Sequence, residues 1–103
     1  MSGGRWNYGH EKLFAAANTI EKMAARNPYG DNAATLAEFS TGVRLMRLAA
    51  IYWRRIDWLV SADDSAESFH RRLQEELREL ATGTFDSSEF EDYYLERELE
   101  ETR

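Results

Sequence analysis

The sequence of 103 residues lacks cysteine, which excludes disulfide bonds, thiolate metal sites and cysteine nucleophiles and fits a reducing compartment. It also lacks a long apolar run. The opening MSGGRWNYGHEK has no hydrophobic segment of the kind found in signal peptides, and the most hydrophobic window contains Arg47, Arg54, Arg55 and Asp57. Charges at these positions exclude a membrane span. We therefore expect a cytoplasmic protein with no membrane partner.

Positive charge is scarce in the second half of the chain. Residues 1–62 contain 8 Lys and Arg against 5 Asp and Glu, whereas residues 63–103 contain 5 against 14. Nucleic-acid binding requires a basic surface, so we expect no direct nucleic-acid binding. The opposite charges of the two halves favour contact between them, within one subunit or between subunits.

Apolar residues at helical spacing predict an all-α protein, a small helical bundle organised on one long central helix from about Ala33 to Val60. The only proline lies in the break at residues 27–32, which separates this helix from a first helix over His10–Arg26. A third helix begins at Asp64 or Ser65 and ends at Gly83. A short N-terminal arm (1–9) completes the helical domain (1–83), and residues 84–103 form an acidic C-terminal helix or tail.

The central helix has two apolar stripes. The first consists of Leu36, Phe39, Val43, Met46, Ala50, Trp53 and Val60. The second consists of Leu45, Leu48, Tyr52, Ile56 and Leu59. So broad an apolar surface must bury two sides, either as the hub of a bundle or as half of a subunit interface. We expect a homo-oligomer, most simply a dimer.

Asp57 interrupts the first stripe, and an ionised carboxylate there must be paired or hydrogen-bonded. One interpretation makes it part of a ligand site. The other makes it the helix-end partner of Arg54, His70, Arg71 or a backbone amide.

Four arginines on the central helix, with no lysine, favour bidentate recognition of carboxylate or phosphate. They are Arg44, Arg47, Arg54 and Arg55. They form either a nucleotide cradle with neighbouring aromatic residues or a ridge that meets the acidic segment from Glu89 to Glu101.

Capping and surface pairing account for the two histidines and the acidic residues near the start of the third helix, so we expect no metal site and no cofactor. These residues are His10, His70, Asp63, Asp64 and Glu67. Further acidic residues superficially resemble the EExxE and ExxD carboxylates of helical nucleotide pyrophosphohydrolases. These are Glu75, Glu76, Glu79, Glu89 and Asp92. Solvated acidic faces explain them more simply.

The chain resembles a family of small bacteriophage and prophage proteins. The resemblance rests on MSGG followed by an aromatic residue and Asn7-Tyr8, on the central Ile56-Asp57-Trp58-Leu59, and on Ser68-Phe69-His70-Arg71-Arg72-Leu73. It extends to about Leu80. Family members commonly have SGD where this chain has Ser61-Ala62-Asp63. The recurrence of these segments as one set implies a shared pocket.

The main functional hypothesis is a phage-type, non-enzymatic binding protein that inhibits a host defence complex stoichiometrically through an acidic surface. The alternatives are an oligomer that sequesters an anionic nucleotide signal and an enzyme of the helical pyrophosphohydrolase type. The predicted binding residues are Trp6, Tyr8, Arg54, Asp57, Trp58, Asp63, Asp64, His70 and Arg71. The predicted acidic partner-binding residues are Glu89, Glu91, Asp92 and Glu96.

Overall fold

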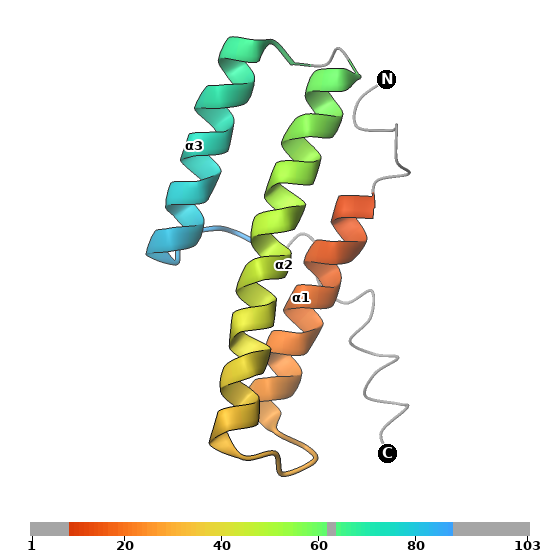
Figure 1. The fold of residues 1–103 in the computed structure, drawn as a ribbon, viewed down its shortest axis with the longest axis vertical. Helices are drawn as coiled ribbons and strands as arrows, with labels where there is room; N and C mark the ends of the chain where they lie inside the picture. The colour runs from red at the N-terminus through yellow and green to blue at the C-terminus, as the bar shows by residue number, and fades with distance from the viewer. Residues whose placement is uncertain (1–8, 62–63, 88–103) are drawn as a thin grey trace.

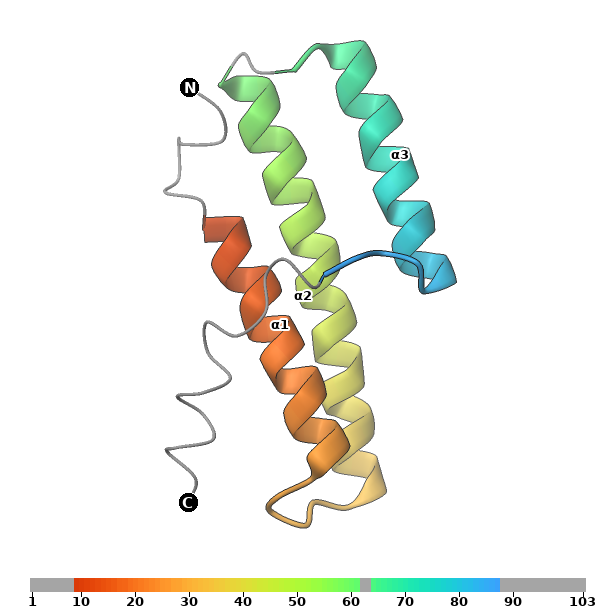
Figure 2. The same ribbon diagram turned by 180° about the vertical axis from the view of Figure 1, so that it is seen from behind.

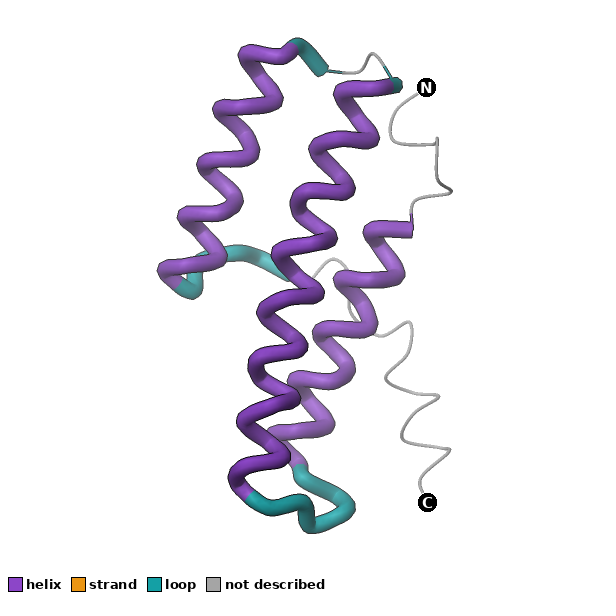
Figure 3. The backbone as a smooth tube through the Cα atoms, viewed as in Figure 1, coloured by secondary structure: helices purple, strands orange, loops and turns teal. Residues whose placement is uncertain are grey.

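Three α-helices make up the computed structural model, which describes residues 9–61 and 64–87 (Figure 1). They are α1 (Gly9–Arg26), α2 (Ala33–Val60) and α3 (Ala66–Thr82). The described residues contain no strand (Figure 3). The predicted all-α fold with one long central helix is therefore confirmed. The predicted N-terminal arm, except Gly9, and the predicted acidic helix from Glu89 lie outside the described residues.

Side-chain caps fix where the helices begin and end. Asn32 accepts a hydrogen bond from the Thr35 amide at 2.9 Å and starts α2, and Ser65 accepts one from the Ser68 amide at 3.1 Å and starts α3. Gly83 ends α3 with a φ of 79°, a left-handed conformation that glycine adopts without strain. The sequence left Asp64 and Ser65 as alternative starts of the third helix, and Ser65 is the cap observed.

α2 is the hub of the fold. α1 runs antiparallel to it and packs along its N-terminal part, whereas α3 packs along its C-terminal half (Figures 1 and 2). The buried core lies where all three helices meet and consists of Phe14, Ala50, Ile51 and Leu73. Because α1 and α3 cover different lengths of α2, neither of these two helices covers part of the surface of α2.

The first apolar stripe of α2 is only partly buried. Val43 and Ala50 are in the interior, whereas Phe39, near its start, and Val60, at its end, are 37% and 45% exposed. The second stripe is more exposed still, with Leu45 at 61%. No helix of the described residues combines the length and apolar character that crossing a bilayer requires.

The residues after Gly83 return to the three packed helices, which we call the helical body. Phe85 stacks on Phe14 with ring centroids 5.5 Å apart and an interplanar angle of 19°. The Asn18 side-chain amide donates to the carbonyl oxygen of Ser87 at 2.8 Å. The helical body therefore extends to Ser87.

Candidate functional site

The most unusual feature of the interior is a group of charged and titratable side chains where the three helices meet. We call it the buried charged cluster; it consists of His10 from α1, Arg54, Arg55 and Asp57 from α2, and Glu76 from α3. His10, Arg55 and Asp57 are 2%, 5% and 0% exposed. Ionised groups are costly to bury unless they are paired, so the positions of the partners determine what this cluster does.

Glu76 pairs with both arginines of the buried charged cluster. Its Oε1 accepts from Arg55 Nε at 2.8 Å, and its Oε2 accepts from Arg54 Nη2. The Arg55 guanidinium also lies 4.4 Å from the centre of the Trp58 ring, and Arg54 lies 5.2 Å from that of Phe14. Planar guanidinium groups suit this combination of carboxylate pairing and stacking on aromatic rings. The arrangement ties α3 to α2.

Asp57 is only partly satisfied. The Ser61 hydroxyl donates to its Oδ1 at 3.2 Å, whereas its buried Oδ2 has no hydrogen-bond partner among the described residues. The partners considered for this side chain from the sequence were Arg54, His70, Arg71 or a backbone amide. The observed hydroxyl comes instead from one turn further along α2.

His10 is buried, which corrects the expectation that it serves in capping or surface pairing. Burial lowers the pKa of its imidazole, and the nearby charges of Arg54 and Arg55 lower it further, while Asp57 opposes them. The neutral imidazole is therefore favoured at neutral pH. His10 contributes to the buried charged cluster without adding a third positive charge.

The predicted binding residues separate into two groups in the structure. Arg54, Asp57 and Trp58 lie together at the buried charged cluster. His70 and Arg71 are exposed on α3, where Arg71 pairs with Glu75 at 3.7 Å. Trp6, Tyr8, Asp63, Glu89, Glu91, Asp92 and Glu96 lie outside the described residues.

Asp64 lies between the two groups, in the loop that connects α2 to α3. It is half-buried, and its Oδ1 accepts from the Ser65 amide at 3.2 Å. Its Oδ2 is buried without a hydrogen-bond partner among the described residues. Its carboxylate therefore shapes the start of α3.

An open groove between α2 and α3 connects Arg55 with the exposed residues of α3. Its volume is about 410 Å³, and it is lined by Arg55, Arg71, Arg72, Glu75, Glu76 and Glu79. The lining has three arginines and three glutamates, so it offers charges of both signs and no net attraction for an anion.

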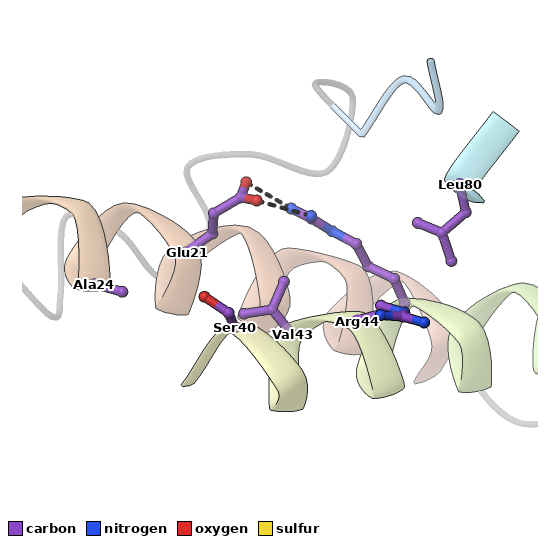
Figure 4. Close-up of a pocket in the computed structure, with 7 residues that line it drawn as sticks. Glu21, Ala24, Ser40, Val43, Arg44 and Leu80 are labelled. Atoms are coloured by element: carbon purple, nitrogen blue, oxygen red, sulfur yellow. Dashed lines mark hydrogen bonds and ion pairs between the residues drawn. The ribbon is translucent and has the colours of Figure 1, made fainter. Parts of the chain in front are cut away.

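A second cavity, of about 220 Å³, lies between α1, α2 and the end of α3 (Figure 4). Glu21 reaches across it, and both of its carboxylate oxygens accept from the Arg47 guanidinium, at 2.9 and 3.0 Å. Arg47 also donates to Asn18 at 2.8 Å. This bidentate pair engages one of the two arginines that line the cavity, and Arg44 is the other.

Two arginines of the ridge have partners within the helical body. The described partners of Arg47 and Arg55 are Glu21 of α1 and Glu76 of α3. The acidic segment from Glu89 lies outside the described residues, so the contact of the ridge with it stays a prediction. The expectation that Glu76 belongs to a solvated acidic face is wrong, since its side chain is only 13% exposed.

Two residues of the buried charged cluster were missed from the sequence, although helical spacing contains a signal for each. His10 precedes the buried Phe14 by four residues and so lies on the same face of α1. Glu76 follows the buried Leu73 by three residues on α3. Each was read as a surface residue because its polarity was given more weight than its position.

Comparison of the chain with protein-family models, with curated proteins and with solved structures found no match. The resemblance to bacteriophage proteins therefore stays a prediction from the sequence motifs. The described residues also contain no group of three or more His, Asp or Glu side chains placed to hold a metal ion.

Proposed function

We propose that the chain is a phage-type, non-enzymatic binding protein that inhibits a host protein complex through the acidic residues after its helical body. The observation that supports this proposal is the distribution of charge. The described residues contain 10 Lys and Arg against 11 Asp and Glu, whereas residues 88–103 contain 2 against 7. The helical body is therefore nearly neutral, and most of the acidic excess of the protein follows it.

The contacts inside the body strengthen this argument. Glu21 and Glu76 are engaged with arginines of α2, so these carboxylates stabilise the fold and are not available to a partner. An acidic segment of net charge −5 attracts basic protein surfaces, including those that normally bind nucleic acid. Such a protein acts stoichiometrically, by occupying a surface.

The two alternative functions have weaker support. A nucleotide sponge needs several cations free to bind phosphate, but Glu21 engages Arg47 in the second cavity, which leaves Arg44, and three glutamates accompany the three arginines of the open groove. A pyrophosphohydrolase needs carboxylates that converge on a metal ion, and Glu76 of the candidate EExxE motif faces Arg54 and Arg55. A ligand retained in native mass spectrometry would support the sponge, and magnesium-dependent nucleotide turnover would support the enzyme.

The acidic-surface proposal is tested by neutralising the four predicted contact residues in one variant, with Glu89→Gln, Glu91→Gln, Asp92→Asn and Glu96→Gln. We expect the original chain, expressed in bacteria that each carry one defence system, to restore phage plating on at least one strain. The neutral variant should not restore it, because the electrostatic attraction to the target is lost. The interaction of the purified proteins should also weaken as salt concentration rises.

A matched control removes carboxylates from the exposed surface of the body, with Glu67→Gln and Glu79→Gln. This control should restore phage plating to the same extent as the original chain. Equal plating with the neutral variant and the original chain would contradict the proposal, provided that circular dichroism shows the same helix content in both.

A further inference from the structure

One face of α2 carries large apolar side chains that α1 and α3 leave uncovered. Leu45, Tyr52 and Ile56 are 61%, 43% and 40% exposed, and Leu48 and Leu59 on the same face are half-buried. We call these five residues the α2 stripe. A contiguous apolar surface of this kind marks an interaction site.

The α2 stripe is symmetric about Tyr52. Leu45 and Leu59 are each seven residues from Tyr52, and Leu48 and Ile56 are each four residues from it. In an α-helix, a side chain seven residues from Tyr52 points about 20° away from the direction of Tyr52, and one four residues away points about 40° from it. Residues before and after Tyr52 at the same spacing are rotated by the same angle in opposite directions. The stripe therefore presents the same pattern when the helix is turned end for end.

We propose that the α2 stripe is a two-fold interface with a second copy of this chain, in which the two α2 helices pack antiparallel and cross near Tyr52. Rotation about the two-fold axis brings Leu45 against Leu59 of the partner subunit and Leu48 against Ile56 of the partner subunit. An isologous interface requires such self-complementarity, because the same surface of both subunits takes part: if one residue contacts a second residue of the partner, that second residue also contacts the first residue of the partner. This inference is independent of the function proposed for the acidic residues.

The chemistry around the α2 stripe also fits a second copy. No charged residue interrupts the stripe itself, so two identical copies meet without like charges in contact. Arg55, about 60° around the helix from Tyr52, borders it and leads to the groove lined by arginines and glutamates of α3. An apolar centre with a rim of both charges is the usual composition of a protein interface.

The length of the α2 stripe suits a helix pair. From Leu45 to Leu59 it extends about 21 Å along the helix axis, enough for several layers of interlocking side chains. Ala49, a small exposed residue within this length, allows the two helices to approach closely.

The first test is sedimentation equilibrium of the full chain and of the variant Tyr52→Glu. Like charges close to the two-fold axis should weaken the dimer by about 100-fold, because such juxtaposition costs several kilocalories per mole. The matched control is Gln74→Glu, which adds the same charge at an exposed position of α3 outside the stripe. It should leave the dimer unchanged. Circular dichroism establishes that both variants remain helical.

The second test determines the direction of the helices. Because the chain has no cysteine, Leu45→Cys and Leu59→Cys each introduce a single thiol. An antiparallel pair predicts that a short bismaleimide reagent links the two variants to each other when they are mixed and links neither variant efficiently to itself. A parallel pair predicts the reverse and would overturn the proposal.

Three further results would also overturn it. A full chain that remains monomeric at its highest soluble concentration, while it binds another protein through the stripe, would assign the stripe to that protein. A full chain that is monomeric, but dimerises when it is truncated after Ser87, would show that residues 88–103 cover the stripe. A dimer in which Tyr52→Glu and Gln74→Glu associate equally would place the interface elsewhere.

Discussion

Arg55 and Glu76 form an ion pair across the interface between α2 and α3, with Arg55 Nε 2.8 Å from Glu76 Oε1. Their side chains are 6% and 13% exposed. Burial lowers the pKa of the Arg55 guanidinium, and the charge of Glu76 acts against this effect. Glu76 also binds Arg54, so one carboxylate contacts two largely buried cations.

Replacement Glu76→Gln should therefore be strongly destabilising. It leaves the buried Arg55 guanidinium without the carboxylate that pairs with it and removes one carboxylate from Arg54, and breaking a buried pair in this way costs about 3–5 kcal/mol. Urea denaturation followed by circular dichroism measures the free energy of unfolding. The control is Glu79→Gln on the exposed surface of α3, which should change this value by less than about 0.5 kcal/mol. Similar losses in the two variants would show that Glu76 does not hold the helices together.

The buried histidine should make stability depend on pH. The pKa of His10 is lowered from its ordinary value of 6.5 in the folded state, chiefly by burial. The unfolded chain therefore binds a proton first as pH falls, so stability is highest above pH 6.5 and decreases below it. The midpoint temperature of thermal unfolding should therefore decrease as the pH is lowered from 7 to about 5.

Substitution His10→Gln should flatten the pH dependence in this range, whereas His70→Gln, at an exposed position, should not. Carboxylates act in a different range. The pKa of Glu21 is lowered from 4.5, first by its hydrogen bond to Arg47, so its contribution is lost only as pH falls below 4.5. Equal pH profiles for the original chain and His10→Gln would refute the role of His10.

The helices could be predicted from the sequence because local signals specify them. Asn32, Ser65 and Gly83 mark helix ends through their own side chains or backbone conformations, and apolar spacing identifies the segments between them. These signals require no knowledge of neighbouring helices. The number, order and approximate length of the described helices followed from them.

The contacts within the buried charged cluster could not be predicted in the same way. Whether Glu76 lies in water or against Arg55 depends on how α3 is rotated and shifted along α2, which side-chain packing decides. His10 likewise became an interior residue because Phe14 and Ala17 turn that face of α1 toward α2. The sequence did identify Asp57 as an anomaly in an apolar stripe, but its hydrogen bond to Ser61 required the structure.

Two glycines allow a matched test of the packing between α1 and α2. A Cβ atom at Gly9 would lie 2.6 Å from Cζ2 of Trp53, far closer than van der Waals contact, whereas a Cβ at Gly42 would meet no atom within 4 Å. Gly9→Ala should therefore destabilise the protein by about 1–3 kcal/mol, because Trp53 must move. Gly42→Ala should stabilise it by about 0.5–1 kcal/mol, because alanine favours the helix. Thermal melting of both variants measures the difference, and equal effects would contradict the close approach at Trp53.

The contact of Phe85 with Phe14 predicts where the chain can be shortened. A chain ending at Gly83 loses the stacked ring and the hydrogen bond from Asn18 to the Ser87 carbonyl oxygen, whereas a chain ending at Ser87 retains the ring. Since Phe85 is half-buried and packs on the core, we expect the shorter chain to be about 2 kcal/mol less stable than the longer one.

The full-length variant Phe85→Ala should lose a similar amount, which would attribute the effect to this one side chain. Urea denaturation of the three proteins makes the comparison. Equal stability of the chains ending at Gly83 and Ser87 would mean that the stacking contributes nothing. If the chain ending at Gly83 is the less stable one, truncation after Ser87 is the one of the two that removes residues 88–103 and leaves the helical core intact. A loss of partner binding by the chain ending at Ser87 can then be assigned to the missing acidic residues.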